Sequence, residues 1–264
     1  LAHPEKRDAY LPAMRASAAH LANPKILVYA DQVYAAKRDE AFDEGQAYLG
    51  YTNLGLGMLR LIEPENPQAA LHDEITARLA RRIEVSKHGM IETYPGETWP
   101  PDVAAVVGSI GLHARATKTD RSALLREWES RFAPCAIHAG SGLLVQRVTS
   151  GGCEMADAPP GSGTAVSAYF LSFAAPALAK KLYDAMASAL WVDVLGFGGF
   201  EEYGPGFHGR GDTNAGPIVF GVSVGATGFG LGAARSQGDR DRFRALYSST
   251  SLFGVPTAIH GRTS

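Results

Sequence analysis

Residues 48–82 read YLGYTNLGLGMLRLIEPENPQAALHDEITARLARR and predict two helices of different character joined by a turn. Residues 48–61 are apolar on every side and almost free of charge, which is typical of a helix that is buried on all faces. Residues 63–67, EPENP, have the composition of a turn. After the turn, apolar residues recur at a spacing of four with charged residues between them, at Ile75, Leu79 and Ile83. The stretch therefore predicts a buried inner helix followed by an amphipathic outer helix.

The same pair of helices recurs along the chain. Turn signals lie near residues 65, 119, 175 and 238, so they repeat at intervals of roughly 54, 56 and 63 residues, as in a repeat architecture. Asp and Pro suit the start of the outer helices. An Asp side chain accepts hydrogen bonds from free backbone N–H groups, and Pro has no N–H group that would need a partner. Residues 5–38 hold helical patterns for a further pair or part of one. The expected inner helices are 48–61, 103–113, 164–173 and 217–234, and the outer helices begin at Ala69, Asp120, Pro176 and Asp239.

These pairs predict an all-α fold, in which about five to six helix hairpins form an α/α toroid. We expect one domain over residues 1–264, with the inner helices in a ring inside the outer ones. The long connections, at 86–102, 133–163 and 192–216, would then gather at one end with the N-termini of the inner helices. An irregular helical domain and an open helical solenoid are the alternatives.

Glycine is the unusual feature of the composition, at 30 of 264 residues, or about 11% against a usual share of roughly 7%. Glycine costs about 1 kcal/mol in a helix interior, so we expect these positions to let neighbouring backbones approach closely. Many lie in the expected inner helices: Gly55, Gly57, Gly108, Gly111, Gly221, Gly225, Gly228, Gly230 and Gly232.

The rest of the composition is that of a globular protein, with 45% hydrophobic and 20% charged residues. A net charge of −2 without a basic run offers no electrostatic footprint for nucleic acid. The sequence has no apolar stretch long enough for a transmembrane helix. Its eight histidines are scattered, and HExxH, GxSxG and P-loop patterns are missing from it, so we expect neither a metal nor a cofactor.

Two cysteines, Cys135 and Cys153, exclude a disulfide scaffold and a cysteine-rich zinc site. We interpret them as two separate thiols, with a disulfide as the alternative. The sequence starts at Leu1, which is compatible with a processed leader and a periplasmic or secreted location, and also with a cytoplasmic one. A homo-oligomer is equally compatible with the sequence.

The loop at 93–102, TYPGETWPPD, combines prolines, aromatic rings and two acids directly before an expected inner helix. Asp102 is suited to be the N-cap of that helix and is also a candidate catalytic acid or base. Glu97 has no evident structural role, so it is a second catalytic candidate. Tyr94 and Trp99 are candidates for substrate binding.

The loop at 201–212, EEYGPGFHGRGD, brings acid, phenol, imidazole and guanidinium groups into twelve residues. Asp212 lies near the start of the expected helix 217–234, much as Asp102 does in its repeat. The two carboxylates would then face each other across the ring as an acid/base pair. The alternative is that Asp212 only caps the helix. His208 is a further catalytic candidate, and the binding candidates of this loop are Tyr203, Phe207 and Arg210.

Three further binding candidates lie on expected inner helices. Tyr51 and Tyr169 need hydrogen-bond partners on helices that are otherwise apolar, and a cavity or a core group would supply them. His113 follows Asp102 on the same helix and is either an acid/base group or a histidine of the helix end.

The segment from Thr93 to Asp102, in which Pro95 and Pro100 lead into a buried helix, resembles the active-site segment of linalool dehydratase-isomerase-like proteins. The resemblance implies an α/α toroid and cofactor-free dehydration and isomerisation of terpene alcohols. That family uses cysteines and an aspartate in its pocket. In this chain the loop has no cysteine, and Thr93 and Asp102 stand near the positions where cysteines are expected.

We therefore expect a cofactor-free acid/base enzyme, a dehydratase-like lyase or isomerase that acts on a small hydroxylated substrate at the mouth of the toroid. Many α/α toroids process carbohydrates, so a glycoside hydrolase or polysaccharide lyase with a glycan substrate is an alternative. A non-catalytic helical binding or scaffold protein is the third possibility.

Overall fold

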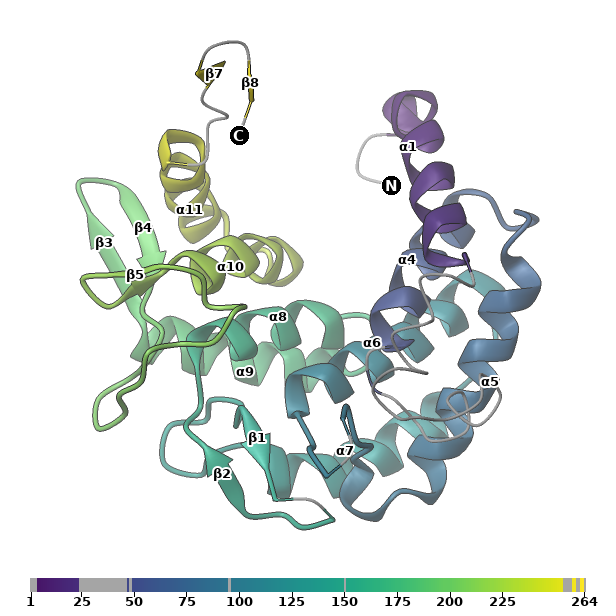
Figure 1. The fold of residues 1–264 in the computed structure, drawn as a ribbon, viewed down its shortest axis with the longest axis horizontal. Coiled ribbons are helices and arrows are strands. Elements are labelled where there is room, and N and C mark those ends of the chain that lie inside the picture. The colour runs from purple at the N-terminus through teal and green to yellow at the C-terminus, as the bar shows by residue number, and fades with distance from the viewer. Residues whose placement is uncertain are drawn as a thin grey trace. The chain divides into compact units, whose positions relative to one another are not determined.

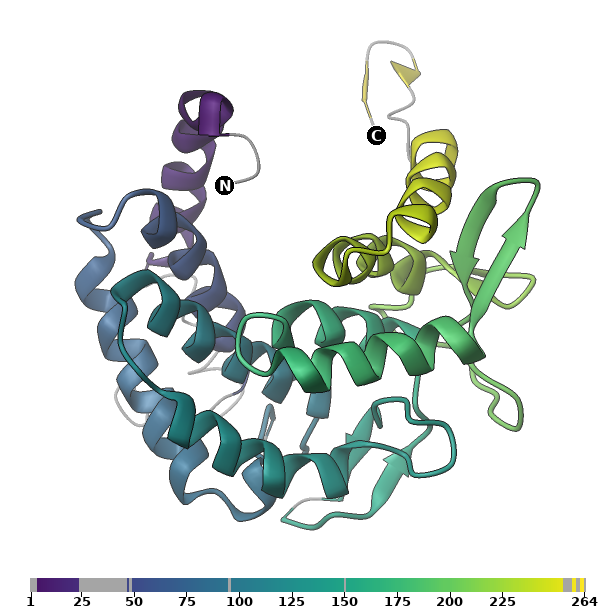
Figure 2. The same cartoon turned by 180° about the vertical axis from the view of Figure 1, so that it is seen from behind.

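The protein is mostly helical, with a few short strands that pair as antiparallel hairpins (Figures 1 and 2). The computed structural model describes residues 4–23, 47, 49–94, 96–149, 151–253, 258–259 and 262–263. The helices are η1 (Pro4–Lys6), α1 (Arg7–Leu21), α4 (Leu49–Ile62), α5 (Ala69–Val85), η2 (Lys87–Gly89), α6 (Pro100–Thr117), α7 (Ser122–Ala136), α8 (Gly161–Leu171), α9 (Pro176–Ala189), α10 (Val224–Gln237) and α11 (Arg240–Phe253). The hairpins are β1 (Arg147–Val148) with β2 (Met155–Asp157), β3 (Trp191–Val194) with β4 (Phe197–Phe200), β5 (Ile218–Val219) with β6 (Val222–Ser223), and β7 (Ala258–Ile259) with β8 (Arg262–Thr263). Among the described helices, none combines the length and the apolar character that crossing a membrane requires.

Four successive pairs of helices, from α4–α5 to α10–α11, follow the predicted order along the chain, with a short connection inside each pair. The predicted start signals also act as expected at two outer helices. The Asp239 carboxylate accepts the N–H of Arg242 at 3.0 Å, and the Asp120 carboxylate accepts the N–H of Ser122 at 2.8 Å. Of the predicted N-terminal pair, α1 is present, whereas residues 24–46 lie outside the described residues.

The chain divides into two compact units. The first consists of Leu1–Ala136, Arg147–Asp157 and Phe170–Leu178, and the second of Ile137–Gln146, Ala158–Tyr169 and Ala179–Ser264. A closed ring and a single domain stay predictions.

Close backbone packing at glycines holds the first unit together. The α4 and α6 helices lie side by side (Figure 1). A Cβ atom built on Gly50 of α4 would lie 2.5 Å from the backbone nitrogen of Val106 in α6. A Cβ atom on Gly108 would lie 2.6 Å from the carbonyl oxygen of Phe170. Since real Cβ contacts are longer than this, the prediction that glycines let helix backbones approach is confirmed at these positions.

The α10 helix of the second unit differs from the prediction. It begins at Val224 and not near residue 217, because the residues before it form the β5–β6 hairpin. Gly221, with a φ of +85°, therefore lies in the turn of this hairpin and not in a helix. Val224 is 58% exposed and Phe229 is 39% exposed, so α10 is not buried on all sides.

Cys135 and Cys153 form a disulfide within the first unit, so the interpretation as two separate thiols is wrong. The bond ties the C-terminal end of α7 to the loop that leads into β2. The sequence left this pairing open, because eighteen residues of separation are compatible with either state.

Candidate active site

Asp102 lies in the first turn of α6 but is not its N-cap. The helix begins with Pro100 and Pro101, which have no backbone N–H, so two of the groups that a cap would satisfy are missing. The cap position is Trp99, and its carbonyl oxygen accepts the N–H groups of Asp102 at 3.0 Å and Val103 at 3.2 Å. Asp102 is therefore not the N-cap residue of α6.

Two hydroxyl groups from other segments of the first unit hold the Asp102 carboxylate. The phenol of Tyr51, on α4, donates to Oδ1 at 2.7 Å, and the hydroxyl of Thr93 donates to Oδ2 at 2.8 Å. Thr93 is buried, whereas Tyr51 is 39% exposed. The Tyr51 ring packs edge-on against Phe170, with ring centroids 5.8 Å apart. Hydrogen bonds to an ionised group are short and strong, so these two partners fix the orientation of the carboxylate.

The loop before α6 is a tight turn that is paired to β1. The Glu97 N–H donates to the Tyr94 carbonyl at 2.9 Å, and the Val148 N–H donates to the Thr98 carbonyl at 3.0 Å. The indole N–H of Trp99 donates to the Glu97 carboxylate at 3.0 Å. These contacts keep three predicted residues, Tyr94, Glu97 and Trp99, half-buried on one loop that leads directly to Asp102. Pro95 lies outside the described residues.

His113 does not belong to this site, although it lies on the same helix. Eleven residues separate it from Asp102, which corresponds to about 16 Å along a helix with a rise of 1.5 Å per residue. Its Nε2 lies 2.7 Å from the carboxylate of Asp73, which also forms an ion pair with Arg60. The structure therefore does not bring His113 to the residues around Asp102, and its role in substrate binding stays a prediction.

The neighbour of His113 at this helix end is a buried, neutral histidine. His72 packs edge-on against His113, with ring centroids 4.8 Å apart, and neither of its ring nitrogens has a hydrogen-bond partner among the described residues. Burial, followed by the nearby His113, lowers the pKa of His72 to about 3. Burial also lowers the pKa of His113. The cluster is therefore part of the packing between the helices.

Asp212, in the second unit, holds a loop turn. One of its carboxylate oxygens accepts the N–H groups of Asn214 at 2.8 Å and Ala215 at 2.9 Å, and the other accepts the side-chain amide of Gln146 at 2.5 Å. The following helix begins only at Val224, so the prediction that Asp212 lies at a helix start is wrong. The physical reason is the β5–β6 hairpin, which the apolar character of the segment concealed.

The other candidates of the second unit lie on the loop after β4 and on α8. His208 and Arg210 are exposed, whereas Tyr203 and Phe207 are half-buried. Gly209 crosses the Tyr203 ring, because a Cβ on that glycine would lie 2.5 Å from the phenol oxygen. Phe207 also packs edge-on against His138, with ring centroids 5.1 Å apart. The candidate on α8, Tyr169, has its ring against Gly232 of α10.

Glu202 is a buried acid that the sequence analysis did not single out. Its side chain accepts the hydroxyl of Ser162 at 2.6 Å and the N–H of Ser162 at 3.3 Å, so it caps the start of α8 from 40 residues away. Burial raises the pKa of Glu202. It is only 1% exposed, which places it out of reach of a substrate. Nothing local distinguishes it from Glu201, so no sequence signal pointed to it.

The predicted residues thus fall into two groups. Tyr51, Tyr94, Glu97, Trp99 and Asp102 come together in the first unit, while Asp212 and its loop belong to the second. The predicted acid/base pair of Asp102 and Asp212 stays a prediction. Among the described residues, the acids, histidines and cysteines close enough to share a metal ion are His88, Cys135 and Cys153, and none of them is a candidate of this site.

No protein-family model matches the sequence, and no curated protein matches it either.

Proposed function

We propose that the protein is an acid/base enzyme, a lyase or isomerase that acts on a small hydroxylated substrate, with Asp102 as its proton-transfer group. One observation carries the proposal: the Asp102 carboxylate is not needed as a helix cap, yet two hydroxyl groups from two other segments hold it in place. Fixing a carboxylate in one orientation is what general acid/base catalysis requires.

In the proposed reaction, Tyr51 and Asp102 act as a pair. For a dehydration, Asp102 takes a proton from the carbon next to the alcohol carbon, and the Tyr51 phenol gives its proton to the departing hydroxyl group. A carbon–carbon double bond forms and water leaves. The proton on Asp102 then returns to the Tyr51 oxygen along the 2.7 Å hydrogen bond, which restores both groups.

The remaining predicted residues have supporting roles in this proposal. Glu97 and Tyr94 orient the hydroxyl group of the substrate, and Trp99 forms an apolar wall. We further propose that the helix pairs close into an α/α toroid, with the long loops at one end. The repeated inner and outer helices support this, as does the resemblance of residues 93–102 to linalool dehydratase-isomerase-like proteins.

The experiment is proton exchange in deuterated water with a panel of small allylic and tertiary alcohols, analysed by mass spectrometry. In the presence of the parent protein, a substrate alcohol should incorporate deuterium or lose water. Asp102→Asn should lower the rate of this reaction by at least about 100-fold, the contribution typical of a general acid or base. The melting temperature of the variant should stay close to that of the parent, because Asp102 caps no helix.

Asp120→Ala is the matched control. Asp120 is an exposed acid that does cap a helix start, so its loss should cost about 1 kcal/mol of stability and leave turnover unchanged. The proposal is wrong if Asp102→Asn behaves like Asp120→Ala, with reduced stability and full activity.

A second candidate function, a binding or scaffold module, has one observation in its favour. Leu195, in the turn of the β3–β4 hairpin, is 93% exposed, and Phe220, in the turn of the β5–β6 hairpin, is 99% exposed. A binding module needs apolar side chains that are accessible to a partner, and these two hairpin turns provide them. The same experiment separates the two functions, because a scaffold turns over no substrate and is indifferent to Asp102→Asn.

A further inference from the structure

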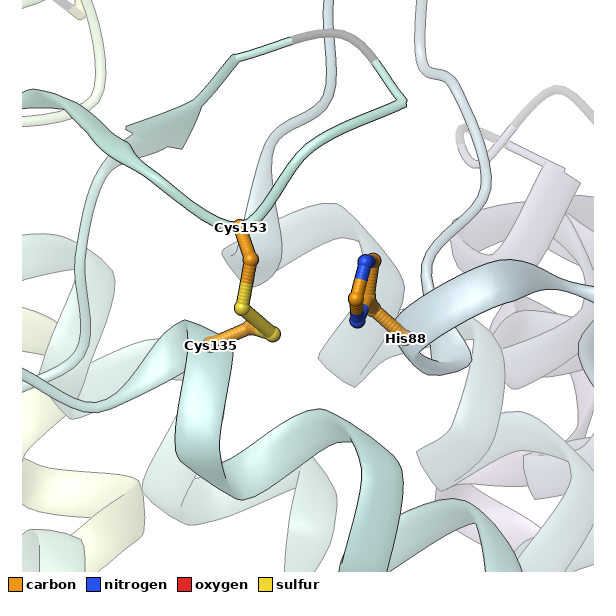
Figure 3. Close-up of side chains that lie close together, drawn as sticks. All are labelled: His88, Cys135 and Cys153. Atoms are coloured by element: carbon orange, nitrogen blue, oxygen red, sulfur yellow. A yellow bond between two sulfur atoms is a disulfide. The ribbon is translucent and has the colours of Figure 1, made fainter.

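His88 lies beside the Cys135–Cys153 disulfide in the first unit (Figure 3). The histidine comes from η2, Cys135 from the last turn of α7, and Cys153 from the loop before β2. One ring nitrogen of His88 and the two sulfur atoms all lie within 4.8 Å of one another. Three potential metal ligands from three segments are thus already gathered.

The backbone around His88 is arranged so that the ring is held near the sulfur atoms. His88 has a φ of +61°, in the left-handed region that residues other than glycine rarely adopt. Gly89 follows with a φ of +66°. Two side chains of α7 tether this turn: the Trp128 indole donates to the Gly89 carbonyl at 2.9 Å, and Arg131 donates to the Ser86 carbonyl at 2.6 Å. The helix that carries Cys135 therefore also fixes the position of His88.

No hydrogen bond or ring contact among the described residues accounts for the direction of the imidazole. It is half-buried, and it makes no hydrogen bond, ion pair or ring contact with the described residues. A strained backbone conformation persists only where the surroundings enforce it, and such positions cluster at functional sites. An imidazole nitrogen beside two cysteine sulfur atoms provides the kinds of ligand that zinc takes in proteins.

The disulfide is open to reduction from one side. Cys135 is buried, whereas Cys153 is exposed on a loop that contains Gly151 and Gly152. A dithiol reductant attacks the accessible sulfur, the S–S bond breaks, and two thiols form while the reductant closes to its own cyclic disulfide. The protein gains two electrons and two protons in this step.

We propose that the reduced protein binds Zn²⁺ through His88, Cys135 and Cys153, with water as the fourth ligand. Binding deprotonates both thiols and releases two protons to solvent. Zinc–sulfur bonds of about 2.3 Å and zinc–nitrogen bonds of about 2.0 Å place tetrahedral ligand atoms roughly 3.5–4 Å apart. The three side chains need only small movements to reach this geometry, and the exposed loop at Cys153 permits them. Thiolate and imidazole ligands favour Zn²⁺ over Mg²⁺ or Ca²⁺.

The test uses Co²⁺ as a spectroscopic probe for the Zn²⁺ site, with the whole chain in its oxidised form and after reduction under nitrogen. The reduced protein should develop a thiolate-to-cobalt charge-transfer band that saturates at one ion per chain, and Zn²⁺ should displace it. The oxidised protein should develop no such band, because its sulfur atoms are bonded to each other.

Two variants assign the ligands. His88→Ala should weaken the apparent affinity for Co²⁺ at least about tenfold, because even the loss of an outer partner of a metal ligand has that effect. His138→Ala is the matched control: His138 is another half-buried histidine, it contacts Ser141, and its loss should leave the affinity unchanged. Circular dichroism of the oxidised variants checks that both retain the fold.

Three results would overturn the proposal. They are a reduced parent without the charge-transfer band, an affinity that is the same in His88→Ala as in the parent, and equal binding by the oxidised protein. The proposal does not depend on the proposed acid/base function, because none of its readouts measures turnover.

Discussion

Replacing Gly108 by alanine should destabilise the protein, whereas the same substitution at Gly228 should stabilise it. Both glycines lie inside helices, Gly108 in α6 and Gly228 in α10. They differ in what a new methyl group would meet. At Gly108 it would lie 2.6 Å from the carbonyl oxygen and 2.9 Å from the carbonyl carbon of Phe170, and at Gly228 it would meet no atom within 4 Å.

The magnitude follows from two opposing effects. Alanine gains about 1 kcal/mol over glycine in a helix interior, at both sites. At Gly108 the neighbours are backbone atoms, which cannot turn aside as a flexible side chain does, so overpacking should cost about 3 kcal/mol, the upper end of its usual range. The net change is a loss of roughly 2 kcal/mol at Gly108 and a gain of about 1 kcal/mol at Gly228.

Differential scanning calorimetry of the oxidised protein measures both effects. At roughly 2–4 °C per kcal/mol for a chain of this length, Gly108→Ala should melt about 4–8 °C below the parent and Gly228→Ala about 2–4 °C above it. A Gly108→Ala variant as stable as the parent would refute the reasoning, because α6 and the chain at Phe170 would then not be in backbone contact.

Two further predictions concern buried ionisable groups. Burial lowers the pKa of His72 from 6.5 to about 3, so the unfolded chain binds a proton that the native state does not. As the pH drops between these two pKa values, the free energy of unfolding should fall by up to about 1.4 kcal/mol per pH unit. His72→Phe should flatten this pH dependence, as measured by urea unfolding. The same pH dependence in parent and variant would contradict the prediction. Burial raises the pKa of Glu202, so its contribution to stability is present in acid and is lost as the pH rises through the native pKa. Glu202→Gln keeps an acceptor for Ser162 without a buried charge, so its free energy of unfolding should match that of the parent at neutral pH. Glu202→Ala should lower the free energy of unfolding by about 2–3 kcal/mol in the same assay. The control Glu201→Ala should lower it by less than about 0.5 kcal/mol. Equal losses for the Gln and Ala variants of Glu202 would exclude this role.

Local sequence patterns predicted where most of the helices begin, but they placed the start of α10 incorrectly. The start of α9 at Pro176 and the cap of α11 at Asp239 follow from chemistry within a few residues, so the sequence was sufficient there. The start of α10 was placed too early, because residues 218–223 are apolar in a way that suits either a buried helix or a short hairpin. Periodicity alone does not separate these two states.

The candidate site shows the same division. The loop at 93–102 was identified from its own composition, and its residues do lie together with Asp102. The partner Tyr51 was predicted only as a substrate-binding residue of an inner helix, because nothing in the sequence indicates which tyrosine reaches Asp102 across 51 residues. His113 lies about 16 Å further along the same helix, as the rise of 1.5 Å per residue requires, and it contacts Asp73 and not the loop at 93–102.

By itself, the sequence determined the repeated pairing of apolar and amphipathic helices, the position of the turns between them, and the loop that carries the candidate acid. These features depend on interactions between residues a few positions apart, which the order of amino acids specifies directly. Only the tertiary structure decided that Asp102 is held by Tyr51 and Thr93, that Glu202 caps α8, and that Cys135 is bonded to Cys153 with His88 beside them. Most of these contacts join segments tens of residues apart, and they exist only because the packing of the helices brings those segments within hydrogen-bonding or bonding distance.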